Sequence, residues 1–516
     1  MPTTWIKNID WLVAWDRANP ETPLERRYGG RHGYLRDADL VFTDGTIDFV
    51  GKGYAGKADT VIDGRGRFVI PGLVNIHTHP CSEPMMKGLS EERKSRQLQM
   101  SSLYEFIFLL GRPSRDIPED ARAQAQADLY GSGDFEAYAA SSQVAIHELL
   151  TSGVTTFVDY SSARPDWLDH VAATGIRCCI APSFRSGAWY TPNGHEVLYR
   201  WDEKNGRKGL DQALRLIDQA KQHPSGRLSG MLAPAQVDTC TPDLFVDASA
   251  AARERAIPIQ THAAQSVVEY REMYRRHGKT PIEWLQSLGV LGPEFIVGHG
   301  IFLDHHPWIM HPDHEDLDRL ADSGTTVAHC PNQFARGGMV LHHFGKYVKR
   351  GVNMGIGTDT FPHNMIDEMR WALTVAKIAS ADIGSTSISD VFHAATAGGA
   401  AALMRDDIGK LEKGCKADFV VVDLGHPQMV PARDPMKSLV VTALERPIRE
   451  VWVDGRTVMR DGKSLQIDLE TNLKGLASGQ QRGMRGIPER DWARRQPEDA
   501  FPMALGTIGS NRPPAR

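Results

Sequence analysis

Eight short apolar runs alternate with longer segments of helical period between residues 70 and 400. The runs read LVNIHTH (73–79), GVTTFVDY (153–160), GIRCCIAPS (175–183), LSGMLAPAQVD (228–238), IPIQTHAA (257–264), FIVGHGIFL (295–303), TTVAHCP (325–331) and VNMGIGTD (352–359). We expect helices between them, at 141–152, 209–222, 243–255, 280–288 and 364–380. Apolar strands separated by helices are typical of a parallel sheet covered on both faces, and eight such units predict a (β/α)8 TIM-like barrel. A doubly wound open sheet is the alternative, because periodicity cannot show closure.

The two flanks of this region have a different pattern. Strand and Gly-containing turn patterns occur at 40–51 and 60–70, and again at 408–424 and 449–463. We therefore expect the ends of the chain to form one small β-sandwich, with residues 1–68 and 406–471 on either side of a barrel at 69–405. Residues 472–516 are rich in Gly, Pro and Arg, which predicts a surface arm or a disordered tail, or a segment that packs on a second subunit.

Composition limits the function classes. The 516 residues are 41% hydrophobic, which is ample for a buried core, and carry a formal net charge of -5. This charge gives no broad basic surface for nucleic acid or an anionic membrane. The first residues do not have the pattern of a secretory signal, and no apolar run reaches the ~18 residues of a membrane span. We expect a cytoplasmic protein whose partner is a small-molecule substrate.

The six cysteines form no CxxC pair and no spaced framework for a chain of this size. A disulfide framework or a structural zinc site is therefore disfavoured. We expect reduced, mostly buried thiols.

Imidazole and carboxylate groups recur where the predicted strands end. His77 and His79 lie two residues apart, so on a strand they leave the same face. Four further groups stand at or near the ends of later runs: His262, His299, His329 and Asp359. A single histidine of this kind is more often a hydrogen-bonded core residue, and Asp359 alone could cap a helix. Because reactive groups collect at the carboxyl ends of barrel strands, their joint placement predicts a divalent-metal site with an open position for water.

At these residues the chain resembles the amidohydrolase superfamily, in the branch of triazine hydrolases and of guanine, cytosine and adenosine-type deaminases. The matching stretches span residues 60 to 460 and read VIPGLVNIHTH, THAAQ, VGHGIFL, VAHCPNQ, GIGTD, AATAGGAAALMRDDIGKLEKGCKADFVVVD and VWVDGRTV. The resemblance implies a barrel with a terminal β-sandwich, a homo-oligomer, and one divalent metal held by His77, His79, His262 and Asp359. Zinc is the first choice, with iron, cobalt and manganese as alternatives. Binuclear members carry a lysine at the end of the fourth strand, and this chain has none in MLAPAQVDTC, so a mononuclear site is expected.

The same resemblance suggests roles in catalysis. Asp359 would take a proton from the attacking water and hand it to the departing nitrogen. His299 would hydrogen-bond the nucleophile or the polarised oxygen, and His329 would bind substrate or support the site. Loops after barrel strands usually line the pocket, so Met86, Trp189 and Phe334 are further candidates for substrate binding.

Gln265 is the position at which the chain departs from the family pattern. Deaminating and dechlorinating relatives have there a glutamate that protonates a ring nitrogen, whereas this chain reads HAAQ. An amide can donate a hydrogen bond but cannot deliver a proton. We therefore expect hydrolysis of an amide, urea or carbamate C–N bond. Deamination or dechlorination of an N-heterocycle is the alternative, and an inactive metal-binding homologue is a second one.

Overall fold

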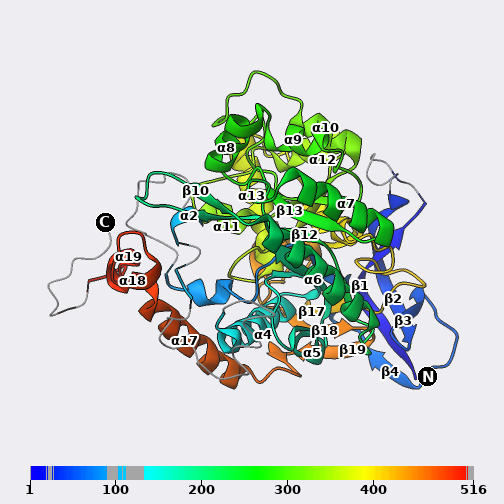
Figure 1. Cartoon of the computed structure of the whole chain (residues 1–516). Coiled ribbons are helices and arrows are strands. Elements are labelled where there is room, and N and C mark those ends of the chain that lie inside the picture. Colours follow the sequence, from blue (N-terminus) through cyan, green and yellow to red (C-terminus); the bar gives the residue numbers. More distant parts are fainter. Residues whose placement is uncertain are drawn as a thin grey trace.

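The fold is described by a computed structural model of the chain (Figure 1), which covers residues 2–18, 20, 26, 28–89, 103–106, 109–111, 133–506 and 508. Every apolar run of the central region contains a parallel strand. These strands are β6 (Leu73–Asn75), β7 (Val154–Ser161), β8 (Arg177–Phe184), β11 (Leu228–Gly230), β12 (Ala233–Pro234), β13 (Ile259–Ala263), β14 (Phe295–His299), β15 (Thr326–His329) and β16 (Asn353–Ile356). The predicted parallel α/β organisation is confirmed.

The parallel strands form two ladders that continue into each other. One ladder has the order β11-β8-β7-β6 and the other β13-β14-β15-β16. Main-chain bridges join Thr78 to Asp359 at one junction and Leu232 to Ile259 at the other. The result is a curled parallel sheet in which the first and eighth runs are neighbours, so the groups after both runs lie at the same end.

Helices cover the outside of this sheet (Figure 1). They are α4 (Phe135–Thr151), α5 (Trp167–Ala173), α6 (Glu203–Gln222), α7 (Pro242–Arg255), α8 (Val267–His277), α9 (Pro281–Ser287), α10 (Asp316–Ser323), α11 (Pro331–Arg336), α12 (Phe344–Arg350), α13 (Met365–Ser380) and α14 (Ile388–His393). Two of the five expected helices begin six residues earlier than predicted, because Asp134 and Asp202 cap α4 and α6 by accepting hydrogen bonds from main-chain N–H groups.

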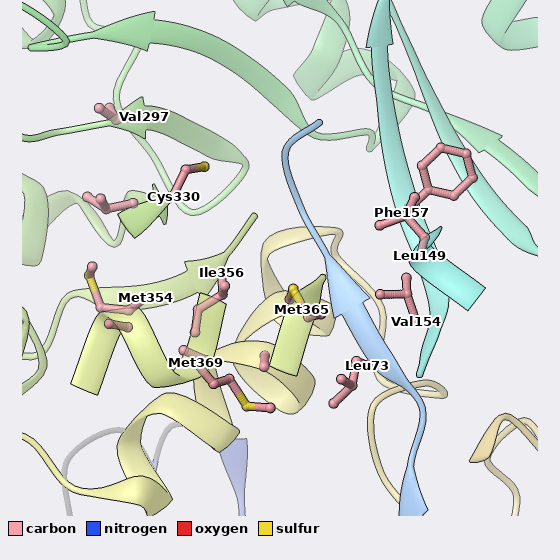
Figure 2. Close-up of a cluster of buried hydrophobic side chains, with 14 of the residues drawn as sticks. Leu73, Leu149, Val154, Phe157, Val297, Cys330, Met354, Ile356, Met365 and Met369 are labelled. Carbon is pink, nitrogen blue, oxygen red and sulfur yellow. The ribbon is translucent and has the colours of Figure 1, made fainter. Parts of the chain in front are cut away.

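The core lies between the sheet and its helices. Figure 2 shows Leu73, Val154 and Phe157 from the first two strands in the same apolar cluster as Met354 and Met365 from the β16–α13 region. The six cysteines are free and buried, as expected. Among the described residues, no helix combines the length and apolar character needed to span a bilayer.

The two flanks of the chain share one further sheet. Its order is β20-β19-β18-β17-β5-β1-β2-β3, with β4 paired to β1. The N-terminal strands are β1 (Thr3–Asp16), β2 (Arg31–Thr43), β3 (Thr46–Gly51), β4 (Thr60–Asp63) and β5 (Arg67–Pro71), and the C-terminal ones are β17 (Phe419–Asp423), β18 (Ile448–Val453), β19 (Arg456–Arg460) and β20 (Lys463–Ser464). Antiparallel pairing of β5 with β17 joins the two ends.

The C-terminal segment differs from the expected arm or tail. Residues 469–500 contain α17 (Leu469–Arg485), α18 (Ile487–Arg490) and α19 (Pro497–Ala500). Figure 1 shows α17 lying along α4 of the same chain. A Cβ on Gly479 would lie 2.4 Å from Ala137 Cβ, and one on Gly475 would lie 2.8 Å from Ala140 Cβ. The glycines that indicated disorder therefore allow two helices to approach closely.

Candidate metal centre and active site

Five predicted side chains meet at the carboxyl end of the curled sheet. His77 and His79 follow β6, His262 belongs to β13, His299 ends β14, and Asp359 follows β16. The Nε2 atoms of His79 and His262 are 3.2 Å apart. Asp359 Oδ1 lies 3.4 Å from His77 Nε2 and 3.3 Å from His79 Nε2. His299 Nε2 is 3.9 Å from Asp359 Oδ2. Within the described residues the possible donor atoms form two groups that share His77, one with His79 and His262 and one with His299 and Asp359, and each group lies within 4.8 Å.

Each of the three clustered imidazoles is oriented by an oxygen atom at its Nδ1. The bonds join His77 to Gln260 Oε1 at 2.9 Å, His79 to the Tyr160 carbonyl at 2.6 Å, and His262 to the Ala235 carbonyl at 2.5 Å. These oxygens only accept hydrogen bonds, so the ring protons sit on Nδ1. The Nε2 lone pairs are left facing one another, which is the arrangement of metal-binding histidines.

The donor set fits a divalent metal ion. Among the described residues the buried His77 Nε2 has no hydrogen-bond partner, although Asp359 Oδ1 lies 3.4 Å away and the ring is held in place through Nδ1. Three imidazole nitrogens and one carboxylate suit zinc and its first-row neighbours. Asp359 has a φ of 57°, a left-handed conformation that brings its carboxylate back over the two histidines after β6.

The electrostatics of the cluster favour cation binding. Burial opposes ionisation of Asp359, but His299, His77 and His79 outweigh it and hold the pKa of this carboxyl well below its usual range. Burial holds the pKa of His262 well below its ordinary value and lowers that of His299 to about 3, so both rings are neutral near pH 7. For His79, burial is outweighed by Asp359, which raises its pKa. A raised pKa means that His79 holds a second proton, on Nε2 beside Asp359, more readily than a free imidazole does. A metal ion bound there would take the place of that second proton.

Tyr160 orients two of the predicted ligands, His79 and His262, and sequence reasoning did not single it out. Its ring centroid lies 5.4, 5.3 and 4.8 Å from those of His77, His79 and His262. Its carbonyl accepts from His79, and its hydroxyl donates at 3.2 Å to the Ala235 carbonyl that holds His262. Tyr160 stands near the end of the second run, at the same end of the sheet as the histidines, and that position was the available signal.

A cavity of about 710 Å³ opens beside the cluster and contacts His79 and His262. Two of the predicted substrate-binding residues, Met86 and Trp189, line it. Trp189 is fixed by a 2.9 Å hydrogen bond from Nε1 to Asp238 Oδ2. The charged side chains of Arg185 and Lys208 also line the cavity, and these were not predicted.

The other three predicted residues lie outside the described lining of this cavity. The Phe334 ring centroid is 4.5 Å from that of His299. Gln265 is 9% exposed and its Oε1 has no hydrogen-bond partner in the described part of the chain. Within the same residues both ring nitrogens of His329 lack a partner, and burial lowers its pKa to about 3.

Comparison with known proteins agrees with this geometry. The model of the Amidohydrolase family matches residues 68–458. A 5'-deoxyadenosine deaminase of Methanosarcina mazei is 27% identical over 443 residues, 84% of this chain and 91% of that protein. A 5-methylthioadenosine/S-adenosylhomocysteine deaminase of Natronomonas pharaonis is 27% identical over 439 residues, with the same coverage.

Two solved enzyme structures illustrate the similarity of the fold. The zinc complex of atrazine chlorohydrolase from Arthrobacter aurescens has a TM-score of 0.70 at 22% identity, covering 92% of this chain and all of that one. The zinc-bound adenosine deaminase from Xanthomonas campestris has a TM-score of 0.70 at 21% identity, covering 93% of this chain and 98% of that one.

Proposed function

The chain belongs to the amidohydrolase family, and on that premise we propose that it uses one bound metal ion to hydrolyse the C–N bond of a small amide, urea or carbamate. The observation that carries the proposal is the set of three imidazoles with their protons fixed on Nδ1 around a buried carboxylate. His77, His79, His262 and Asp359 would hold the metal. Zinc suits this donor set, and two structures of the same fold are described as zinc-bound.

The proposal extends to the architecture. The curled sheet would close as a (β/α)8 barrel over residues 69–405, because bridges occur at both of its junctions. Residues 1–68 and 406–471 would form the β-sandwich, supported by the β5–β17 pairing. A single metal fits better than two, because the stretch that ends the fourth strand contains no lysine.

The side chains around the cluster divide the chemistry between them. A metal held by these ligands would lower the pKa of bound water towards about 7. Asp359, ionised near neutral pH, accepts the proton of the attacking water and delivers it to the departing nitrogen. The neutral ring of His299 donates a hydrogen bond to the carbonyl oxygen as negative charge develops there. The products are a carboxylic or carbamic acid and an amine or ammonia.

Gln265 supports a carbonyl substrate. A ring substrate gains electron density on nitrogen when water attacks, and a proton at that nitrogen assists the step. Gln265 has no proton to transfer, and the buried carboxyl nearby, Glu269, is turned towards the main-chain N–H groups of Ala264 and Gln265. A carbonyl substrate places its charge on oxygen instead, where His299 can reach it.

A second candidate function is deamination or dechlorination of an N-heterocycle. Its support is the activity of the two relatives compared above, which are deaminases of adenosine-type compounds. An inactive metal-binding homologue is the remaining alternative. The complete set of His77, His79, His262, His299 and Asp359 argues against it.

Product analysis separates these functions. The zinc-loaded protein would be incubated with acetanilide, phenylurea, 5'-methylthioadenosine and a chlorotriazine, and aniline, ammonia and chloride would be measured. The proposal predicts that acetanilide or phenylurea is turned over faster than 5'-methylthioadenosine and the chlorotriazine. Treatment with a chelator should abolish this turnover, and added zinc should restore it. Faster release of ammonia from the nucleoside, or of chloride from the triazine, would establish the second function. No turnover of any compound would favour the inactive homologue.

A further inference from the structure

One wall of the cavity belongs to the segment that follows β6. Met85 and Met86, from the short helix η1 (Glu83–Met86), line the cavity together with Leu110 and Gly111. The apolar clusters that contain Met85 and Met86 include residues of α4 and of the C-terminal segment, and the C-terminal residues lie beyond the matched range 68–458.

Hydrogen bonds from α17 hold the main chain of this wall. Gln480 Nε2 donates to the Met85 carbonyl at 2.6 Å and to the Lys87 carbonyl at 2.9 Å. Leu476 packs against Met85 in the same cluster. The close approach of Gly479 to Ala137 brings α17 near enough for the Gln480 amide to reach both carbonyls.

Partly buried ion pairs anchor α17 and the segment between α18 and α19. Arg482 binds Asp134, the cap of α4, through two hydrogen bonds of 2.7 and 3.1 Å. Arg495 Nη2 lies 2.7 Å from Glu105 Oε1, and the Glu105 side chain is only 1% exposed. Trp492 Nε1 donates to the same oxygen at 2.9 Å. Removing a partner from a buried carboxylate is costly, so Arg495 and Trp492 fix the position of the Glu105 segment.

Apolar contacts connect the C-terminal residues 487–501 to both the wall and the loop after β16. Met86 shares one buried cluster with Ile487 and Phe501, and Phe361, two residues after Asp359, packs against that cluster. The Arg490 side chain lies directly against Gly111, since a Cβ there would be 2.8 Å from the guanidinium carbon.

We propose that residues 469–501 are part of the active-site architecture, and that they position the wall at Met85, Met86, Leu110 and Gly111 so that the cavity holds substrate tightly. Gln480 and Arg495 are positioning residues in this arrangement. They act on substrate binding and leave the metal cluster and the proton transfers unchanged. Only the effect on kcat and KM rests on the proposed function, whereas the positioning of the wall can be tested without turnover.

The test compares matched substitutions in the full zinc-loaded protein. Gln480→Ala removes the two bonds to the wall, and Gln481→Ala changes its exposed neighbour. Arg495→Ala, Arg495→Lys and Arg494→Ala form a second set, since Arg494 is exposed. The readouts are zinc content, kcat and KM on the panel compound that is hydrolysed fastest, and amide hydrogen exchange over residues 83–89.

We expect Gln480→Ala to raise KM about threefold to tenfold with kcat within about twofold of the parent, and to speed exchange over residues 83–89. Arg495→Ala should act in the same direction, and Arg495→Lys should recover part of the loss. Unchanged KM and exchange in Gln480→Ala would overturn the inference, as would lower thermal stability with normal KM. Without turnover of any panel compound the proposed function fails, and the exchange comparison with Gln481→Ala still decides whether α17 holds the wall.

Discussion

Removal of the Tyr160 hydroxyl tests how the metal centre is built. In Tyr160→Phe the ring stays among the three histidines, and the main-chain carbonyl that accepts from His79 is unchanged. Only the hydroxyl is lost, and with it the hydrogen bonds to the Pro234 and Ala235 carbonyls at 3.1 and 3.2 Å. The Ala235 carbonyl fixes Nδ1 of His262, so the substitution should loosen one of the proposed metal ligands.

Two magnitudes follow from these contacts. Loss of a donor to buried carbonyls costs about 1–3 kcal/mol of the free energy of unfolding. Substitution of a residue that orients a metal ligand weakens metal binding about 10- to 100-fold. Zinc affinity would be measured by competition with a chromogenic chelator, with Tyr274→Phe as the control because Tyr274 is 48% exposed. Parent-like zinc affinity in Tyr160→Phe, together with a lowered melting temperature, would refute the positioning role.

Three further outcomes are expected. Asp359→Asn should reduce kcat by more than the ~10²- to 10⁴-fold of general acid–base help alone, because ligand and proton carrier are lost together; near-normal turnover at full metal content would show that the proton travels elsewhere. Elemental analysis should find one tightly bound metal per chain, and two would contradict the mononuclear site. Burial lowers the pKa values of His299 and His329 to about 3 and of His363 to about 4, against 6.5 when unfolded. As pH falls below 6.5, the unfolded metal-free chain gains protons that these three buried rings exclude in the folded chain. The free energy of unfolding, measured with denaturant, should therefore fall by up to about 1.4 kcal/mol per histidine per pH unit. A free energy of unfolding that stays constant between pH 6.5 and 4 would contradict this expectation.

The strand positions could be predicted because buried parallel strands leave a strong apolar signal. Each of the eight runs contains a strand, and the groups at their ends converge because parallel strands end on the same side of the sheet. This geometry brings His77, His79, His262, His299 and Asp359 together from segments almost 300 residues apart.

The residues that orient these proposed ligands carry no comparable signal. Gln260 and Tyr160 hold His77 and His79 through contacts between different strands, and such contacts depend on the three-dimensional packing. Gln260 lies two residues before His262, on the same face of its strand, but a buried glutamine in an apolar run has many structural explanations.

The C-terminal helices were missed for a related reason. Gly475, Gly479 and Gly483 recur every four residues and lie on one face of α17, where they allow close approach to the rest of the chain. Glycine in such numbers disfavours an isolated helix, so the sequence indicated an arm or a tail. Packing against α4 outweighs the low helix propensity.

The most direct test of the reaction is kcat/KM of the native protein and of Gln265→Glu on phenylurea and on 5'-methylthioadenosine, with the zinc content of both forms matched. The proposal predicts that the native protein prefers phenylurea. It also predicts that Gln265→Glu lowers this activity, because a second carboxylate beside the cluster perturbs binding without supplying a proton that a carbonyl substrate needs. A native protein that prefers the nucleoside, and is faster on it as Gln265→Glu, would contradict the assignment and establish a deaminase.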